Sequence, residues 1–213
     1  MKLTVHEFLT LDGVMQGPGA PGEDTSGGFE RGGWQVPYTE DEDFGRIVGG
    51  WFEQVAEFLL GRSTYDMMYA YWSQVTDPGD IVAAKLNGLP KHIVSATLAD
   101  AEWQNSVVIG GDVVGRVQEL KKRPGGELQV HGSWQLVRTL HEAGLIDEYR
   151  LMVFPVVVGP GKRLFDAHSP ASGFTLVDSA VTGSGAVYQV LRPTVFRAGR
   201  YLVEGGREVS EVG

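Results

Sequence analysis

The chain has 213 residues, of which 42% are hydrophobic and 21% charged, values typical of one folded domain rather than of a disordered or fibrous protein. Its 27 acidic and 18 basic residues give a net charge of −9 without any Lys/Arg-rich stripe, which argues against nucleic acid as a partner. The absence of cysteine excludes disulfides, thiolate metal sites and a cysteine nucleophile, and it favours a cytoplasmic location. No apolar stretch approaches the roughly 18 residues that span a bilayer, so we expect no membrane segment.

The first quarter of the chain predicts a strand, a long loop and a helix. Alternating apolar and polar residues indicate a strand at residues 2–9, which ends at the turn Leu11–Gly13. Residues 16–33 are rich in Gly, Pro, Asp and Ser without periodicity, and loops of this length inside a domain are often functional, so we interpret them as a candidate lid. Apolar residues at i, i+3 and i+4 spacing then predict an amphipathic helix at residues 42–56.

Strands and helices alternate through the middle of the chain. A buried strand is expected at residues 57–61, followed by a helix that is capped by Ser63 or Thr64 and extends to Trp72. Further strands and helices are expected in the order 91–95 (strand), 106–109 (strand), 112–123 (helix capped by Asp112), 127–131 (strand), 133–143 (helix) and 148–158 (strand).

The C-terminal part ends the domain with antiparallel strands. Residues 173–178 and 186–191 read as a hairpin joined by a Gly/Ser turn, whereas residues 194–213 read as a polar surface tail with a short strand at 200–203. We therefore predict one α/β domain over residues 1–193, with a three-layer, doubly wound, mainly parallel mixed sheet and an antiparallel C-terminal edge hairpin.

Several familiar motifs are excluded by their context. Gly17, Gly19 and Gly22 match the letters of a dinucleotide-binding fingerprint, but prolines interrupt them and no helix starts there. There is no P-loop, and the five histidines show no metal-ligand spacing, so we expect no bound metal. Ser133 lacks the second glycine of a nucleophile elbow because Gln135 stands there, which leaves a serine hydrolase a weak alternative.

Two strand-to-helix turns have properties that suit an anionic ligand. The first places Gly61 at a strand end and follows it with the cation of Arg62 and two hydroxyl residues. The second places Gly132 and Ser133 at the start of another helix, whose positive dipole end suits a pyrophosphate. The alternative is that both are ordinary turns in which Gly saves space and Ser or Thr caps a helix.

Five segments carry a resemblance when taken together and in this order. They are TLDGVMQ (10–16), FLLGRSTYD (58–66), KHIVSATL (91–98), VHGSWQLVRTLHEAGLIDEYRL (130–151) and PVVVGPGKRLF (155–165). In combination they resemble the dihydrofolate-reductase-like family that includes the C-terminal reductase domain of the bacterial riboflavin-biosynthesis enzyme, and the match extends over residues 2–192.

The resemblance implies a homodimeric, NADPH-dependent oxidoreductase. Its hydride would go to a small carbonyl compound or to a heterocycle such as a pteridine or a ribosylaminopyrimidine, as in 5-amino-6-(5-phosphoribosylamino)uracil reductase or dihydrofolate reductase. The cofactor-binding positions carried over are Gly61, Arg62, Ser63 and Thr64 for the phosphates, Ser95 and Thr97 for the adenosine 2′-phosphate, and Gly132, Ser133 and Trp134 for the pyrophosphate. Ala96 stands where family members often have Arg or Lys, so the preference for NADPH over NADH stays open, with Arg62 left to supply the charge.

The group that supplies the proton is expected to be Asp12. It follows the first strand in TLDG, where it would deliver a proton or orient the substrate; the alternative is a turn residue that bonds its own backbone. WQVP at 34–37 with the acids at 40–43 loosely resembles the acidic site of dihydrofolate reductases, although acids at a helix start are favoured by the helix dipole alone. Asp147 and Glu148 would line the same cleft, or simply be solvated.

Two functions compete on this basis. The first is the NADPH-dependent reductase, and the second is a non-catalytic nucleotide-binding or dimeric scaffold protein of the same fold. In either case a dimer is expected to bury apolar residues of the strand at 148–158 and of the terminal hairpin against a second copy, unless each chain covers them itself.

Overall fold

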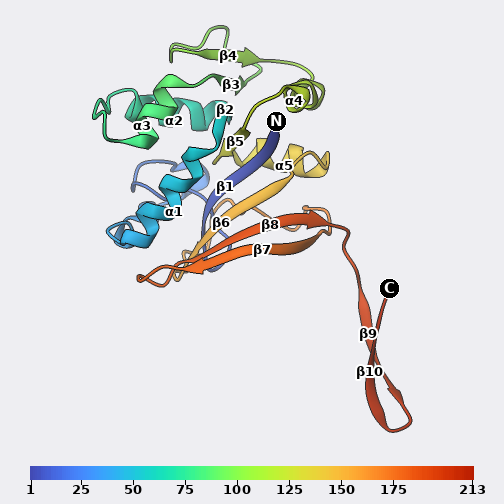
Figure 1. Ribbon diagram of the computed structural model, residues 1–213. Coiled ribbons are helices and arrows are strands. Elements are labelled where there is room, and N and C mark those ends of the chain that lie inside the picture. Colours follow the sequence, from blue (N-terminus) through green and yellow to red (C-terminus); the bar gives the residue numbers. More distant parts are fainter.

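A computed structural model describes all residues, 1–213, and its centre is an eight-stranded sheet in the order β4-β3-β2-β5-β1-β6-β8-β7 (Figure 1). The strands from β4 to β6 are mutually parallel, and β8 and β7 add antiparallel strands at one edge. The strands of this sheet are β1 (Lys2–Thr10), β2 (Val55–Gly61), β3 (Lys91–Val94), β4 (Ser106–Ile109), β5 (Glu127–His131), β6 (Glu148–Phe154), β7 (Gly173–Val181) and β8 (Val187–Thr194).

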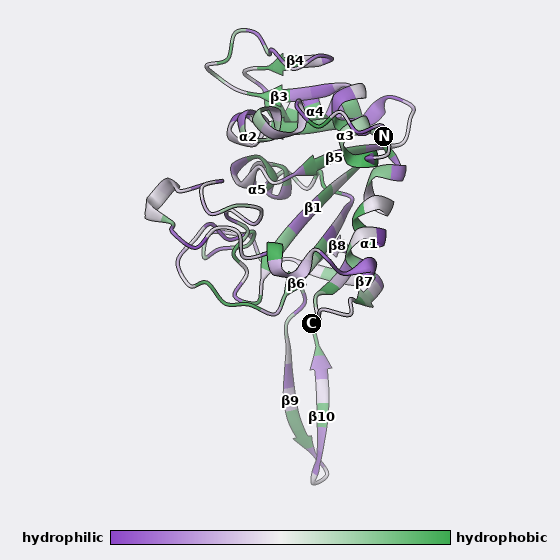
Figure 2. Cartoon of the chain, turned by 90° about the vertical axis from the view of Figure 1, so that its left-hand side faces the viewer, coloured by the Kyte–Doolittle hydropathy of each residue, from purple (hydrophilic) through white to green (hydrophobic).

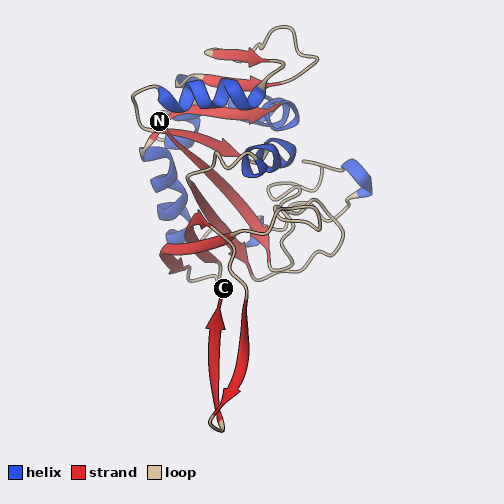
Figure 3. Ribbon diagram, turned by 90° about the vertical axis from the view of Figure 1, so that its right-hand side faces the viewer, coloured by secondary structure: helices blue, strands red, loops and turns tan.

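Helices cover both faces of the sheet, which makes three layers (Figure 3). Buried side chains of α1, α2 and α3 belong to an aromatic-rich core cluster on one face, and those of α4 and α5 belong to an aliphatic cluster on the other. The helices are α1 (Glu42–Glu53), α2 (Arg62–Trp72), α3 (Ile81–Gly88), α4 (Val113–Lys122) and α5 (Trp134–Glu142), with short 3-10 turns at Ser26–Gly28 and Val36–Tyr38. The predicted fold class is thereby confirmed.

Strand β1 shows how the sequence pattern divides these two clusters. Leu3, Val5 and Leu9 lie on the aliphatic side, whereas Phe8 packs with the aromatic cluster. Because successive side chains of a strand point to opposite faces, one central strand contributes to both cores.

Three local predictions need correction. The N-cap of α2 is Gly61 rather than Ser63 or Thr64, because the Thr64 hydroxyl accepts a hydrogen bond from another turn. Helix α3 was not expected, since its sequence IVAAKLNG has no amphipathic stripe, yet the Asp80 carboxylate caps it by accepting from the Ala83 N–H at 2.9 Å. Strand β6 ends at Phe154 and not at residue 158, because Pro155 has no N–H to continue the ladder.

The C-terminal tail forms a second hairpin. Strands β9 (Gly199–Glu204) and β10 (Arg207–Val212) pair only with each other, around Gly205 and Gly206, which both have positive φ. Only the strand at 200–203 had been expected within this tail. Figures 1 and 2 show the hairpin standing away from the body, with apolar and polar stretches along it. No helix of the chain is long and apolar enough to cross a membrane.

Candidate functional site

A cavity of about 570 Å³ lies at the carboxyl ends of β2, β3 and β5. Such strand ends are the usual location of ligand sites in open α/β sheets. It is lined by every expected cofactor-binding residue except Gly132, namely Gly61, Arg62, Ser63, Thr64, Ser95, Thr97, Ser133 and Trp134. The structure therefore brings together residues that lie far apart in the chain.

The two strand-to-helix turns are joined directly to each other. The Gly61 N–H donates to Oγ of Ser133 at 2.9 Å, and the Ser133 N–H donates to Oγ1 of Thr64 at 2.9 Å. Gly132 does not line the cavity, but it permits this contact: its φ is +56°, and an added Cβ would lie 3.2 Å from the Thr64 side chain. The two turns form one hydrogen-bonded floor of the cavity.

The helices that start at this floor differ from the others in how they begin. The N-termini of α1, α3 and α4 are each capped by an aspartate side chain, from Asp41, Asp80 and Asp112 respectively. In contrast, α2 and α5 have no side-chain hydrogen bond at their N-caps, Gly61 and Ser133. Their first N–H groups are therefore available to an anion, which the positive end of a helix dipole attracts.

Arg62 is a partly exposed residue of the cavity lining. Its Nε is 2.8 Å from both carboxylate oxygens of Asp66, one helical turn further along, and the Arg62 side chain is 41% exposed. An exposed pair of this spacing is weak, so the guanidinium can exchange Asp66 for a phosphate at little cost.

The end of β3 forms a polar corner of the same cavity. The Ser95 hydroxyl oxygen accepts hydrogen bonds from the N–H groups of Thr97 (3.2 Å) and Leu98 (3.0 Å). This turn exposes Ala96 and Thr97, which both line the cavity with Ser95. The residue directly after Ser95 is Ala96 and not a cation. The only Arg or Lys side chains that line the cavity are Arg62 and Lys162.

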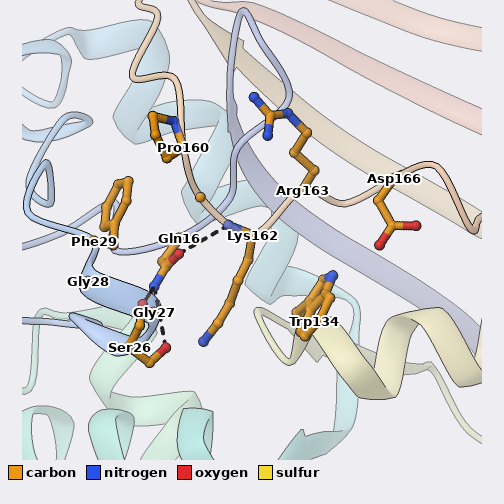
Figure 4. A pocket seen from close by; sticks show the side chains of 11 residues that line it. Gln16, Ser26, Gly27, Gly28, Phe29, Trp134, Pro160, Lys162, Arg163 and Asp166 are labelled. Carbon is orange, nitrogen blue, oxygen red and sulfur yellow. Dashed lines mark hydrogen bonds between the residues drawn. The ribbon is translucent and has the colours of Figure 1, made fainter.

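A second cavity of about 360 Å³ adjoins the first, with Trp134 and Lys162 lining both (Figure 4). The expected lid contributes residues 26–29 to its wall. In Figure 4 the Lys162 side chain extends between Ser26 and Trp134. The candidate lid thus borders the site.

Lys162 was not singled out from the sequence as a site residue. The side-chain Nζ of Lys162 pairs with Asp24 of the lid at 2.6 Å, and the backbone N–H of Lys162 donates a hydrogen bond to Oε1 of Gln16 at 3.0 Å. Gln16 also donates from Nε2 to the Ser26 carbonyl at 2.9 Å, which holds the lid in place. The sequence did carry a signal for these residues: the motif TLDGVMQ ends at Gln16, and the motif GPGKRLF contains Lys162.

Asp12 lies outside both cavities. Its carboxylate accepts hydrogen bonds from the Thr10 hydroxyl at 2.6 Å and from the Gly159 N–H at 2.8 Å, and Arg163 lies 3.4 Å away. Burial raises the pKa of Asp12, but the hydrogen bonds from Thr10, Gly159 and Val158 outweigh it and leave the pKa below its ordinary value. The ionised carboxylate joins the turn after β1 to the loop after β6.

Several of the other acids considered in the sequence have structural contacts. Asp41 caps α1 by accepting from the N–H groups of Asp43 and Phe44. Asp147 accepts from the Leu3 N–H at 2.8 Å, and Glu148 pairs with Lys2. Asp147 and Glu148 lie at the start of β6, the end of the strand opposite the cavity. The structure shows no cluster of three or more His, Asp or Glu residues placed to hold a metal ion.

Solved structures share this fold across nearly the whole chain. A putative riboflavin biosynthesis protein from Shewanella sp. PV-4 superposes with a TM-score of 0.67 at 19% identity, covering 91% of this chain and 99% of that one. A pyrimidine reductase-like protein from Corynebacterium diphtheriae gives 0.61 at 10% identity, covering 91% and 92%. Dihydrofolate reductase from Enterococcus faecalis, complexed with NADP(H) and RAB-propyl, gives 0.58 at 12% identity, covering 90% and 96%.

Sequence comparison extends the likeness to the family level. The uncharacterized protein YyaP from Bacillus subtilis (strain 168) is 27% identical over 188 residues, which cover 87% of this chain and 92% of that protein. The family model of the RibD C-terminal domain matches residues 1–188, which include every element of the cavity. The chain therefore belongs to the RibD C-terminal domain family, whose reductase fold it shares with dihydrofolate reductase.

Proposed function

We propose that the protein is a reductase that uses NADPH to transfer a hydride to a small heterocyclic or carbonyl acceptor. One observation carries the proposal: the two helices that start at the cavity, α2 and α5, lack the side-chain caps that the other three helices have. Uncapped N-termini at the carboxyl edge of a parallel sheet are suited to bind a pyrophosphate. The NADP(H) complex of the fold neighbour from Enterococcus supports the same cofactor class.

The lining residues fit such a cofactor in size and chemistry. Gly61, which has no side chain, leaves the start of α2 open; a Cβ there would lie 3.4 Å from Ser133. We assign the pyrophosphate to Gly61–Thr64 and Gly132–Trp134, and the adenosine to Ser95 and Thr97. We then assign the 2′-phosphate to the cation of Arg62. Arg62 directly follows β2, and β2 is the neighbour of β3, which carries Ser95 and Thr97 at its end.

The cofactor supplies the hydride when bound, and the chain supplies binding, orientation and exclusion of water. Trp134 and Lys162 line both cavities, so they separate the cofactor region from the space beneath the lid. We assign that second space to the acceptor. The ammonium of Lys162 can donate hydrogen bonds to an acceptor oxygen or nitrogen once its bond to Asp24 exchanges.

Asp12 is assigned an orienting role rather than proton delivery. Its lowered pKa and its bonds to Thr10 and Gly159 keep it ionised and occupied. By tying the turn after β1 to the loop that carries Lys162, it positions that lysine. It is a positioning residue under this proposal.

Calorimetric titration with NADPH and NADH tests the proposal. We expect NADPH to bind, and oxidation of bound NADPH on adding a pteridine, a ribosylaminopyrimidine or a small carbonyl compound. Binding without turnover over that panel would favour a non-catalytic nucleotide-binding protein. If the protein binds neither NADPH nor NADH, both the reductase and the nucleotide-binding protein are excluded.

A further inference from the structure

Glu7 is a buried acid that the proposed function does not use. It is 4% exposed on β1, and its Oε1 is enclosed without a hydrogen-bond partner. Burial raises the pKa of Glu7 well above its ordinary value, which favours the protonated, uncharged carboxyl. Native proteins rarely leave a buried polar group unpartnered, so such a group calls for an explanation.

The strand register places Glu7 beside the floor of the cavity. It lies between Val5 and Leu9 on the β1 face that α4 and α5 cover, where the neighbouring residues are aliphatic. The parallel register of β1 with β5 ends at the pair His6 and His131, so Glu7 is level with Gly132, where the turn into α5 begins. Leu9 shares its core cluster with Met15, and Met15 lines the cavity.

The sheet order gives the direction in which a dinucleotide lies. The strands β3, β2 and β5, whose carboxyl ends meet the cavity, are neighbours in the sheet, and β1 follows β5 in the same order. A pyrophosphate at the turns after β2 and β5 leaves one half of the cofactor toward β3 and the other toward β1. The β3 end is exposed at Ala96 and Thr97, whereas Met15, the lining residue that follows β1, is 7% exposed. Exclusion of water favours hydride transfer, so under the proposed function we assign the nicotinamide half to the buried β1 end.

We propose that the Glu7 carboxyl binds the carboxamide of the nicotinamide ring and thereby sets the orientation of that ring; the inference rests on the proposed function. An uncharged carboxyl offers one O–H donor and one carbonyl acceptor, and a primary amide offers the complementary N–H and C=O. The two groups therefore form a pair of parallel hydrogen bonds. Glu7 is buried and does not line the cavity in this structure, so binding requires neighbouring side chains to move. Met15, which lines the cavity, is unbranched and adapts easily.

The test compares ligands with and without the carboxamide. Glu7→Met removes both hydrogen-bonding groups at similar size, and Glu7→Gln keeps one donor and one acceptor. The dissociation constants of NADPH and of 2′-phospho-ADP-ribose, which lacks the nicotinamide, are measured by calorimetry for the unaltered chain and both variants. We expect Glu7→Met to weaken NADPH about tenfold, as the loss of two hydrogen bonds implies, without changing 2′-phospho-ADP-ribose. Glu7→Gln is expected to restore NADPH binding.

Each other outcome has a definite meaning. Equal weakening of both ligands would show that Glu7 only supports the turn, and unchanged NADPH binding would show no contact; either overturns the inference while leaving the proposed function intact. If the unaltered chain binds neither ligand, the proposed function fails and the inference with it. Should Glu7→Met not fold, Glu7→Asp, which withdraws the carboxyl by one methylene, is expected to show the same selective loss.

Discussion

The backbone N–H of Ser133 donates a hydrogen bond of 2.9 Å to Oγ1 of Thr64, 69 residues earlier in the chain. This bond joins the turn before α5 to the first turn of α2. It explains why Thr64 lies inside α2 instead of capping it. The bond makes the spacing between the two phosphate-binding turns a property of the tertiary structure.

Replacing Thr64 by Val removes that acceptor and leaves the Ser133 N–H without a partner. We expect a loss of about 1–3 kcal/mol in the free energy of unfolding, measured by urea denaturation, together with weaker NADPH binding. Thr64→Ser keeps the hydroxyl and is the matched control. Thr64→Val with normal stability and affinity would show that the bond does not hold the two turns together.

Arg62→Ala is expected to weaken NADPH more than NADH. The lost charge-assisted bond to the 2′-phosphate corresponds to about tenfold or more in affinity, measured by calorimetric titration of each nucleotide. Arg46→Ala is the control, because Arg46 also pairs with a neighbouring acid, Asp43, at 2.8 Å, but on α1, away from the cavity. An equal loss for NADPH and NADH would place Arg62 on the shared pyrophosphate.

His131 is expected to make the fold sensitive to acid. Burial first, and the charge of Arg150 second, lower the pKa of His131 to about 3. The unfolded chain takes up a proton on this residue near its ordinary pKa of about 6.5, while the folded chain does not. His131 therefore lowers the stability as the pH falls from about 6.5 towards 3, by about 1.4 kcal/mol per pH unit.

The measurement is the free energy of unfolding between pH 7 and pH 4. Other groups titrate in this range too, including Glu7, whose raised pKa has the opposite effect on stability. The slope of the free energy of unfolding against pH in the unaltered chain is therefore the sum of several contributions. The difference between that slope and the slope of His131→Gln isolates His131. Parallel slopes would contradict the prediction, and the exposed His168, replaced by Gln, is the control.

The expected dimer is tested at β7. Both faces of β6 are covered within the chain, since Tyr149, Leu151, Met152 and Phe154 are all buried, so the interface is not expected there. The edge strand β7 instead exposes Leu176 (55%). We expect light scattering to give twice the 23.1 kDa of one chain, and Leu176→Asp to halve that mass.

Val107→Asp is the control for that variant. Val107 is 56% exposed on β4, the edge strand at the opposite end of the same sheet. The same loss of mass in both variants would indicate a non-specific effect of the added charge. A mass of one chain at every concentration would contradict the dimer.

Local patterns were sufficient to predict most of the elements. Alternation located β1 and helical spacing located α1, because side chains that share one face of a strand or helix recur with a fixed period. The period was absent from α3, whose apolar residues follow no stripe, and α3 was missed for that reason. The strand β10 was missed too, since charged residues on an exposed hairpin leave little alternation to detect.

The sequence by itself also identified the two turns with their glycines and hydroxyls, because backbone conformation and hydrogen-bonding capacity are local properties of residue types. Only the tertiary structure decided what these residues face. It joined Ser133 to Thr64, surrounded Asp12 with hydrogen-bond donors outside both cavities, and brought Lys162 between the lid and Trp134. Contacts of this kind depend on the order of strands in the sheet, and that order is determined by packing between segments distant in the chain.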